Sequence, residues 1–300
     1  MADGTSGLMA VAEDCRGFTA GFRLARCEEC ILHLGLPSAL SRLGATPSAA
    51  IRLWNGRPAP RTTELRELPT LELYEYEASP WCRRVRETLC VLGLPALIRP
   101  CPRETLRVEG AFSSLARHKP DVKGRLIFPY LVDHTADVAL NESRDIVEHL
   151  WNSYGDGVER PRADALLNGG ALPRLIDFGL LAGPSGFRPW ASCGLTVAPS
   201  STPAEPLVLH GNEPDPGTRL VREMLCSLQI AYRHVPSDAP NVPHLEDPNT
   251  GFATFGAGHA CRHVAETYAK GAPLSHLAPV PEPNLGDARR SWMSPLFTFL

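Results

Sequence analysis

The clearest alternation of apolar and polar positions lies in residues 71–155. Leucines alternate with polar residues over 71–76, which predicts a half-buried strand. Apolar residues then recur at helical spacing from Pro80 to Leu92, and Gly93 is well placed to end that helix. Further patterns predict strands at 95–100, 126–133 and 138–140, and helices at 112–118 and 144–154. The order β-α-β-α-β-β-α predicts a mixed sheet with helices on its faces.

Residues 206–270 repeat this pattern. At an offset of 136 the framework residues of the first strand and helix recur, including Leu73 as Leu209 and Arg86 as Arg222. Beyond them the offset falls to 114, so that Pro129 matches Pro243. The second copy is therefore 22 residues shorter (136 − 114), and the deletion falls where the first copy has its second predicted helix. These matches predict an internal duplication.

The two copies differ where chemistry is expected. Ser79-Pro80-Trp81-Cys82 becomes Asp215-Pro216-Gly217-Thr218 in the second copy. Asn141-Glu142-Ser143 becomes Phe255-Gly256-Ala257. Because the framework is kept and the candidate site is not, we expect the first copy to be functional and the second to be degenerate.

The remaining segments show weaker patterns. Residues 1–70 are poorly defined, with a short helix expected within 22–36. Residues 156–205 contain a series of glycine and proline breakers and are interpreted as a linker with a short helix near 172–181. Residues 271–300 form a proline-rich tail whose apolar end is a candidate docking segment.

Composition excludes several function classes. Hydrophobic residues make up 43% and charged residues 21% of the 300-residue chain, which is ordinary for a protein with packed cores. The net charge of −3 suggests neither a nucleic acid nor an anionic membrane as a partner. No apolar run has the length of a membrane span, and the first residues do not resemble a secretory signal. Nine scattered cysteines indicate reduced thiols in a reducing compartment, and the sequence does not decide between cytoplasm and plastid.

The candidate chemistry gathers at the start of the first predicted helix. Ser79 is a good N-cap, and Cys82 lies in the first turn, where free amides and the helix dipole favour a thiolate. The structural alternatives are that Ser79 only caps the helix and that Cys82 only packs beneath the strand. Three arginines follow and are interpreted as a solvated helix face, with anion binding as the alternative: Arg83, Arg84 and Arg86. No metal site is predicted, because the lone Cys27-x-x-Cys30 has no second pair of ligands at suitable spacing.

Three motifs carry a resemblance to a known family. They are Tyr74-Glu75-Tyr76-Glu77-Ala78-Ser79-Pro80-Trp81-Cys82-Arg83-Arg84-Val85-Arg86-Glu87, Phe128-Pro129-Tyr130-Leu131-Val132-Asp133, and Glu142-Ser143 followed by Asp145-Ile146-Val147. In this order and spacing they resemble the thioredoxin-like N-terminal domain of glutathione S-transferases. More narrowly, the chain is similar to the tandem type found in plants and other photosynthetic organisms. The resemblance implies an α/β fold with two thioredoxin-like βαβαββα units, at 71–155 and 206–270.

The resemblance also implies roles for individual residues. Pro129 matches the cis-proline of the family, and the backbone of Phe128 meets the cysteinyl group of glutathione, the expected co-substrate. Glu142 and Ser143 match the pair that binds the γ-glutamyl end, which suits a carboxylate facing an ammonium and a helix N-terminus facing a carboxylate. Ser79 takes the place of the catalytic Cys or Ser.

Three functions remain open at this stage, and enzymatic activity is itself undecided. The leading one is a glutathione S-transferase-like protein in which Ser79 stabilises the glutathione thiolate. The second is a non-catalytic interaction protein that binds a protein partner, and the third is a monothiol reductase that acts through Cys82. A dithiol centre is disfavoured, because Ser79 replaces the first sulfur.

Overall fold

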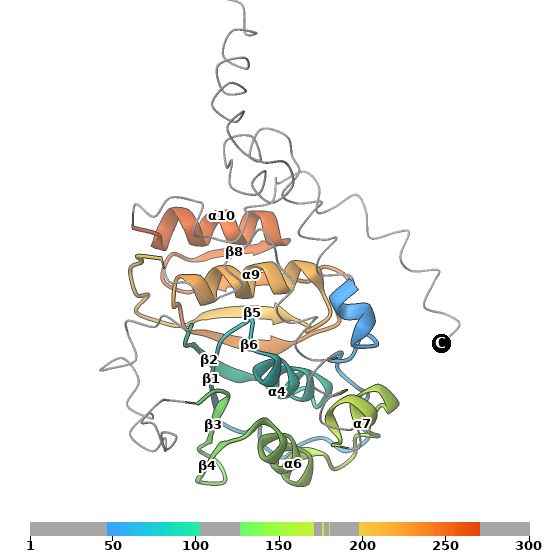
Figure 1. Cartoon of the computed structure of the whole chain (residues 1–300). Helices are drawn as coiled ribbons and strands as arrows, with labels where there is room; N and C mark the ends of the chain where they lie inside the picture. The colour runs from blue at the N-terminus through green and yellow to red at the C-terminus, as the bar shows by residue number, and fades with distance from the viewer. Residues whose placement is uncertain (1–46, 103–126, 171–175, 177–179, 181–197, 271–300) are drawn as a thin grey trace, which may run out of the picture.

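The computed structural model describes residues 47–102, 127–170, 176, 180 and 198–270, and it has a mixed α/β fold (Figure 1). Within these residues, eight strands form one sheet in the order β4-β3-β1-β2-β6-β5-β7-β8. The strands are β1 (Leu71–Glu75), β2 (Ala96–Pro100), β3 (Tyr130–Asp133), β4 (Val138–Asn141), β5 (Leu207–Gly211), β6 (Tyr232–Pro236), β7 (His244–Asp247) and β8 (Phe252–Phe255). The helices that the structure describes in full are α4 (Pro80–Val91), α6 (Ser143–Tyr154), α7 (Arg162–Asn168), α9 (Pro216–Ser227) and α10 (Ala257–Tyr268).

Local sequence signals set the limits of α4. The side-chain oxygen of Ser79 accepts a hydrogen bond from the backbone N–H of Cys82, and Pro80 occupies the first helical position. Gly93 has φ +64°, and the N–H of Leu94 reaches back to the carbonyl of Leu89, which ends the helix as predicted. The third strand is shorter than predicted and begins at Tyr130, directly after the cis Phe128–Pro129 bond.

The elements β5 to α10 follow the same order and lengths as β1 to α6. The bounds of β5, α9 and β6 equal those of β1, α4 and β2 plus 136. The bounds of β7, β8 and α10 equal those of β3, β4 and α6 plus 114. We call β1 to α6 the first set and β5 to α10 the second set. Both Phe128–Pro129 and Val242–Pro243 are cis, as expected for Pro129.

The two sets join through their edge strands. β2 pairs with β6 in the antiparallel sense, with Ala96 opposite His234 and Ile98 opposite Tyr232. Because 96 + 136 = 232 and 98 + 136 = 234, exchanging the two sets leaves this register unchanged. The pairing is therefore two-fold symmetric in the way of an isologous dimer interface, although both strands belong to one chain.

One hydrophobic core runs beneath both sets. Inward residues of the strands pack with apolar residues of α4, α6, α9 and α10 in a single cluster, so these helices cover the same face of the sheet (Figure 1). Ile146, Val147 and Leu150 of α6 are buried, as are Cys90 and Cys226 at equivalent positions of α4 and α9. A smaller cluster on the opposite face contains Tyr74 and Tyr130.

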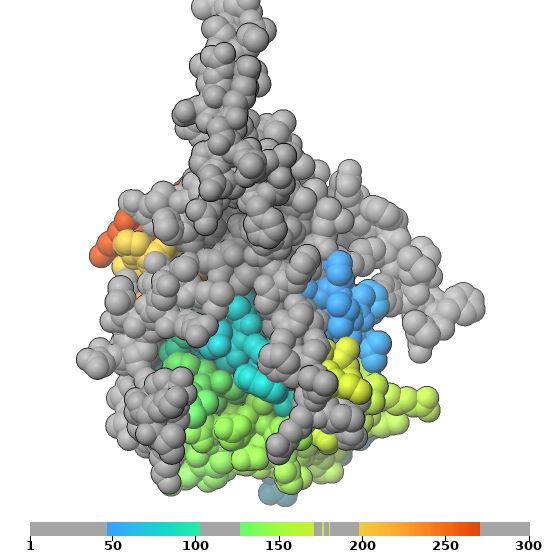
Figure 2. Space-filling view, viewed as in Figure 1, coloured from blue at the N-terminus to red at the C-terminus, as the bar shows by residue number. Residues whose placement is uncertain are grey.

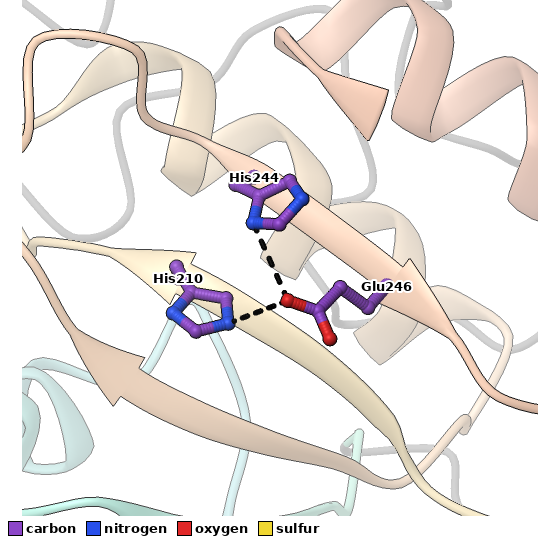
Figure 3. Close-up of side chains that lie close together, drawn as sticks. All are labelled: His210, His244 and Glu246. Atoms are coloured by element: carbon purple, nitrogen blue, oxygen red, sulfur yellow. Dashed lines mark hydrogen bonds and ion pairs between the residues drawn. The ribbon is translucent and has the colours of Figure 1, made fainter. Parts of the chain in front are cut away.

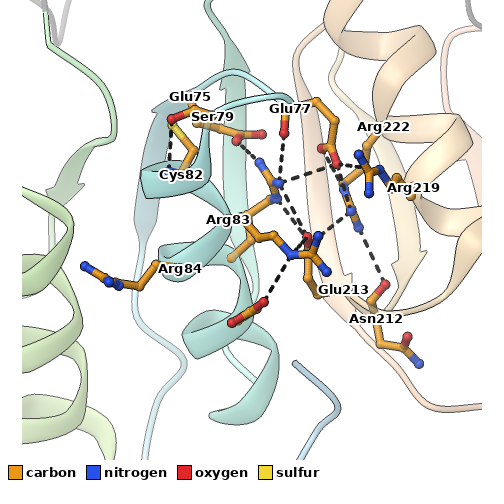
Figure 4. A network of polar contacts seen from close by, with 12 residues as sticks. Glu75, Glu77, Ser79, Cys82, Arg83, Arg84, Asn212, Glu213, Arg219 and Arg222 are labelled. Atoms are coloured by element: carbon orange, nitrogen blue, oxygen red, sulfur yellow. Dashed lines mark hydrogen bonds and ion pairs between the residues drawn. The ribbon is translucent and has the colours of Figure 1, made fainter. Parts of the chain in front are cut away.

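Buried ion pairs also cross from one set to the other. Arg86 Nε lies 3.1 Å from Glu213 Oε2, and Arg222 Nε lies 3.0 Å from Glu77 Oε2. Each pair is the counterpart of the other at the offset of 136. Arg86 also donates to the carboxylate of Glu75 on its own set. Figure 4 shows Glu77, Glu213 and Arg222 of this network meeting between the two sets.

Polar side chains from outside the two sets also bind α4, through the carboxylate of Glu87. Arg52, which directly follows the helical residues 47–51, makes a two-point ion pair with Glu87, with Nη2–Oε2 at 2.6 Å and Nε–Oε1 at 3.0 Å. Asn168 of α7 donates to the same carboxylate at 3.2 Å. The interpretation of 156–205 as a linker is thus wrong for its first part, because α7 packs against α4 and buries Asp164 and Asn168.

Other predictions fall outside the described residues. They concern the helices at 22–36 and 112–118, most of the one at 172–181, the Cys27–Cys30 motif and the tail at 271–300. Within the described ranges, no helix has the length and apolar character required to cross a bilayer.

Candidate functional site

A pocket of about 390 Å³ lies where the N-terminal turns of α4 and α6 approach the loop before β3. Its lining includes Phe128 and Pro129 from that loop, and Glu142, Ser143 and Arg144 from the start of α6. Trp81, Arg84 and Ile127 complete the lining. The first set forms the lower part of the face shown in Figure 2. The structure thus brings together four of the six predicted site residues: Phe128, Pro129, Glu142 and Ser143.

The other two predicted residues lie deeper in the fold. Ser79 and Cys82 are fully buried and do not line the pocket. Burial, together with the nearby carboxylate of Glu75, raises the pKa of the Cys82 thiol to about 12. The expectation that the helix start favours a thiolate is therefore wrong for Cys82 in this structure, because desolvation outweighs the amides of the first turn.

Arg84 lines the pocket, although the sequence pattern favoured a solvated position and left anion binding as the alternative. Its side chain is buried, with 1% of its surface exposed, and its Nη1 donates to Ser143 Oγ at 3.3 Å. Its guanidinium lies 5.4 Å from the ring centroid of Trp81. Figure 4 shows Arg84 pointing away from the ion-pair network between the sets. The prediction of a solvated arginine face is wrong, because all three arginines are buried. Arg83 and Arg86 lie within the ion-pair network, and Arg84 lies outside it.

Glu142 has an unusual backbone conformation. It is the N-cap of α6 with φ +74° and ψ 107°, a region that non-glycine residues rarely occupy. Its side chain makes no capping hydrogen bond and is exposed at the pocket. Such a conformation is costly, by about 1–3 kcal/mol, and outliers of this kind gather at functional sites. The carboxylate is therefore held beside the pocket in a conformation that helix capping does not require.

The second set lacks the polar groups of this pocket. Arg84 corresponds to Leu220, Glu142 to Gly256 and Ser143 to Ala257. Gly256 has φ +86°, so the second set places glycine where the backbone favours it. Arg84 is exchanged for Leu220 between the identical pairs Arg83/Arg219 and Val85/Val221, and this is the sequence signal that points to Arg84 as a candidate site residue.

This arrangement suits a ligand that carries an ammonium and a carboxylate close together. The first backbone amides of α6, the hydroxyl of Ser143 and the guanidinium of Arg84 offer donors to a carboxylate. The carboxylate of Glu142 can receive an ammonium. The apolar surfaces of Phe128, Pro129 and Trp81 border the rest of the space.

One comparison with known proteins covers the pocket-bearing set. Residues 73–161 match the family model of the glutathione S-transferase N-terminal domain. The match contains every described element of the first set except the beginning of β1, and it extends to the residue before α7. Neither a search of curated proteins nor one of solved structures finds a match.

Proposed function

We propose that the pocket of the first set binds glutathione or a related γ-glutamyl thiol, and that the chain is a glutathione S-transferase-like protein. The observation that carries this proposal is the grouping of Arg84, Glu142 and Ser143 at the start of α6, with Glu142 at positive φ. The family match of residues 73–161 supports it independently.

The γ-glutamyl end of glutathione fits the polar side of the pocket. Its α-carboxylate meets the N-terminus of α6, Ser143 and Arg84, and its ammonium meets Glu142. The backbone of Phe128, before the cis-proline Pro129, faces the cysteinyl part. Each charged hydrogen bond contributes about 1.5–3 kcal/mol, so the loss of one weakens binding by roughly ten- to a hundredfold.

Transfer chemistry is the second part of the proposal. Ser79 Oγ accepts the N–H of Cys82 at 3.2 Å and retains its own hydrogen, which it can donate to a thiolate. Donation to the glutathione sulfur stabilises the anion and thereby lowers the pKa of the thiol. If Ser79 acts in this way, Ser79→Ala abolishes conjugation of glutathione to an aryl halide and leaves glutathione binding within twofold.

A specific observation favours a second candidate, a protein that binds glutathione or a protein partner without catalysis. Ser79 and Cys82 are both fully buried beneath the pocket lining. This second candidate is supported if the wild-type protein binds glutathione but does not conjugate it to an aryl halide. The monothiol reductase is the least supported of the three, because the raised pKa of Cys82 keeps its sulfur protonated.

We further propose that the two sets are copies of one thioredoxin-like unit, as in the tandem type seen in photosynthetic organisms. Residues 71–155 form the glutathione-binding unit and 206–270 its shortened, degenerate copy. The equal element lengths at offsets of 136 and 114 support this, as do the matched caps Ser79 and Asp215. The degenerate unit then serves as a scaffold for the first.

The binding proposal is tested by ligand analogues. Glutathione and S-methylglutathione, titrated into the full chain, are expected to bind with similar affinity, because the pocket residues that we invoke contact the γ-glutamyl end. Free glutamate tests the polar side alone, and cysteinylglycine, which lacks the γ-glutamyl group, is not expected to bind. Equal binding of glutathione and cysteinylglycine would contradict the proposed orientation.

A further inference from the structure

Three potential metal ligands meet on the second set, on the sheet face opposite the helices. His210 lies on β5, and His244 and Glu246 lie on β7 (Figure 3). His210 is directly opposite His244 in the antiparallel ladder, and Glu246 is two residues further along the same strand. Directly opposite residues and residues two apart share a face, so the register itself brings the three side chains together.

The distances between their ligand atoms suit a small cation. Glu246 Oε1 lies 3.1 Å from His210 Nε2 and 3.5 Å from His244 Nδ1, and all three ligand atoms lie within 4.8 Å of one another. In a tetrahedral zinc site with bonds of about 2.0–2.1 Å, neighbouring ligand atoms are about 3.3–3.4 Å apart. The two distances from Glu246 Oε1 lie on either side of this value.

The same positions in the first set have an entirely different character. They hold Tyr74, Tyr130 and Val132, which are buried in the small cluster on that face. The side chains of the second set are instead accessible, with 30% of His210, 22% of His244 and 45% of Glu246 exposed. The connection between β6 and β7 has 7 residues (237–243), against 29 (101–129) between β2 and β3, so it is too short for a covering helix. An apolar cluster has thus been replaced by an open group of imidazoles and a carboxylate.

The surroundings also favour ligand binding by the two imidazoles. The ring of His244 stacks on Phe255 of β8 with a centroid distance of 4.3 Å, which restricts its orientation. The His210 and His244 rings lie 5.2 Å apart with an interplanar angle of 30°. All three ligands stand on paired strands rather than on loops, so the site is held in place before an ion arrives.

We propose that His210, His244 and Glu246 form a binding site for a divalent transition-metal ion, with Zn²⁺ as the preferred occupant. Two imidazoles and one carboxylate form a common ligand set for zinc, and imidazole disfavours Mg²⁺ and Ca²⁺. Three protein ligands leave a fourth position for water or for a donor atom of a ligand. Sequence alone does not reveal the site, because His210 and His244 lie 34 positions apart in the chain and become neighbours only through the β5–β7 register.

The test is a calorimetric titration of Zn²⁺ into the full, reduced chain. Wild type is expected to bind one ion at this site, and His210→Asn, His244→Asn and Glu246→Gln are each expected to weaken that binding at least tenfold. His259→Asn, at an exposed position of α10, is the matched control and retains wild-type affinity. The double variant Cys27→Ser/Cys30→Ser also retains it, which separates this site from the cysteine pair.

Thermal unfolding with and without Zn²⁺ gives a second readout. Binding to the native state raises Tm, and this rise is expected in wild type and in His259→Asn but not in the three ligand variants. Their Tm without metal shows that they fold. Wild type that binds no Zn²⁺ at micromolar concentration, or binding that survives all three ligand substitutions, would overturn the proposal, as would binding lost with Cys27 and Cys30.

Discussion

At the scale of single residues, Glu142 links backbone conformation with the chemistry of the pocket. Its φ of +74° is a conformation that glycine adopts at no steric cost, and Gly256 has φ +86° at the corresponding position of the second set. The first set therefore keeps a carboxylate where stability alone favours glycine. A binding role explains this choice, because Glu142 makes no capping hydrogen bond.

Glu142→Gly is expected to separate stability from binding. Removing the side chain relieves the strained conformation, so the free energy of unfolding rises by up to about 1 kcal/mol. Glutathione affinity falls at least tenfold, because the ammonium of the ligand loses its partner. Urea unfolding and calorimetry measure the two effects. Asp137→Gly, at φ +52° in the turn between β3 and β4, is the control and leaves glutathione affinity unchanged. A less stable Glu142→Gly variant with wild-type affinity would refute the role of Glu142.

The sequence predicted part of this site and missed another part for a physical reason. Phe128, Pro129, Glu142 and Ser143 were identified from family motifs, and the structure brings them to one pocket. Arg84 was assigned to solvent, because charged residues are mostly exposed unless they are paired. Its burial depends on neighbours from α6 that are 59 residues away along the chain. Long-range partners of this kind leave no local pattern.

At the scale of elements, α4 and α9 are held together by reciprocal buried ion pairs. Arg86 meets Glu213, and Arg222 meets Glu77. Burial by itself raises the pKa of Glu213, but Arg222, Arg86 and Arg83 outweigh it and lower the pKa to about 2. A buried network of this kind is costly to break, because removing one member leaves its partner charged and poorly solvated.

Glu213→Gln is expected to lower the free energy of unfolding by about 3–5 kcal/mol. The exposed pair of Arg57 and Asp238 provides the control, with 44% and 49% of the side chains exposed and 4.0 Å between charged atoms. Asp238→Asn is expected to change stability by less than about 1 kcal/mol. Urea unfolding of both variants checks this contrast, and similar effects for the two would show that the buried network contributes little.

Acid stability is expected to depend on Glu87. Burial alone raises the pKa of its carboxyl, but Arg52 and Arg83 bring the pKa down from 4.5 to about 2. A carboxyl with a lowered native pKa stabilises the fold above its unfolded pKa, and that contribution is lost as pH falls from 4.5 to 2. Compared with wild type, Glu87→Gln is therefore expected to be less stable at neutral pH. It is also expected to lose less stability than wild type as pH falls from 4.5 to 2.

Urea unfolding at several pH values between 2 and 7 measures the dependence on Glu87. Glu148→Gln, at an exposed position of α6, is the control and is expected to keep the wild-type pH profile. If Glu87→Gln keeps the same slope as wild type in the acid range, the ion pair of Glu87 with Arg52 does not govern acid stability.

Local signals predicted most elements well but did not predict how they assemble. Ser79, Pro80 and Gly93 set the limits of α4, and the two offsets located the elements of the second set. Helix α7 was missed, because its seven residues show little periodicity and are held by contacts with α4. The pairing of β2 with β6 was also missed, since edge pairing depends on contacts across 136 residues.

At the scale of the whole molecule, the eight strands act as one sheet. The β2–β6 pairing is antiparallel and two-fold symmetric, and the helices of both sets pack on one continuous core. The ion pairs between Arg86 and Glu213 and between Arg222 and Glu77 lie beside this pairing. The second set therefore pairs and packs with the pocket-bearing set, although it lacks the polar groups of the pocket.

We expect the two sets to unfold together. Hydrogen exchange measured across a urea series is expected to show β1 and β5 losing protection at the same urea concentration, because neither set keeps a complete core when the other unfolds. Separate midpoints, with β5 exposed while β1 stays protected, would show that the sets are independent domains.

The central claim is that the polar pocket of the first set binds glutathione. The most direct test is a calorimetric titration of glutathione into wild type and into the variant that carries the residues of the second set, Arg84→Leu/Glu142→Gly/Ser143→Ala. These three replacements already occur at equivalent positions of the same fold, so the variant is expected to fold, which circular dichroism checks. Binding by wild type and loss of at least a hundredfold in affinity in the variant are the predicted results. No binding by wild type at millimolar glutathione, or equal binding by both proteins, would contradict the account.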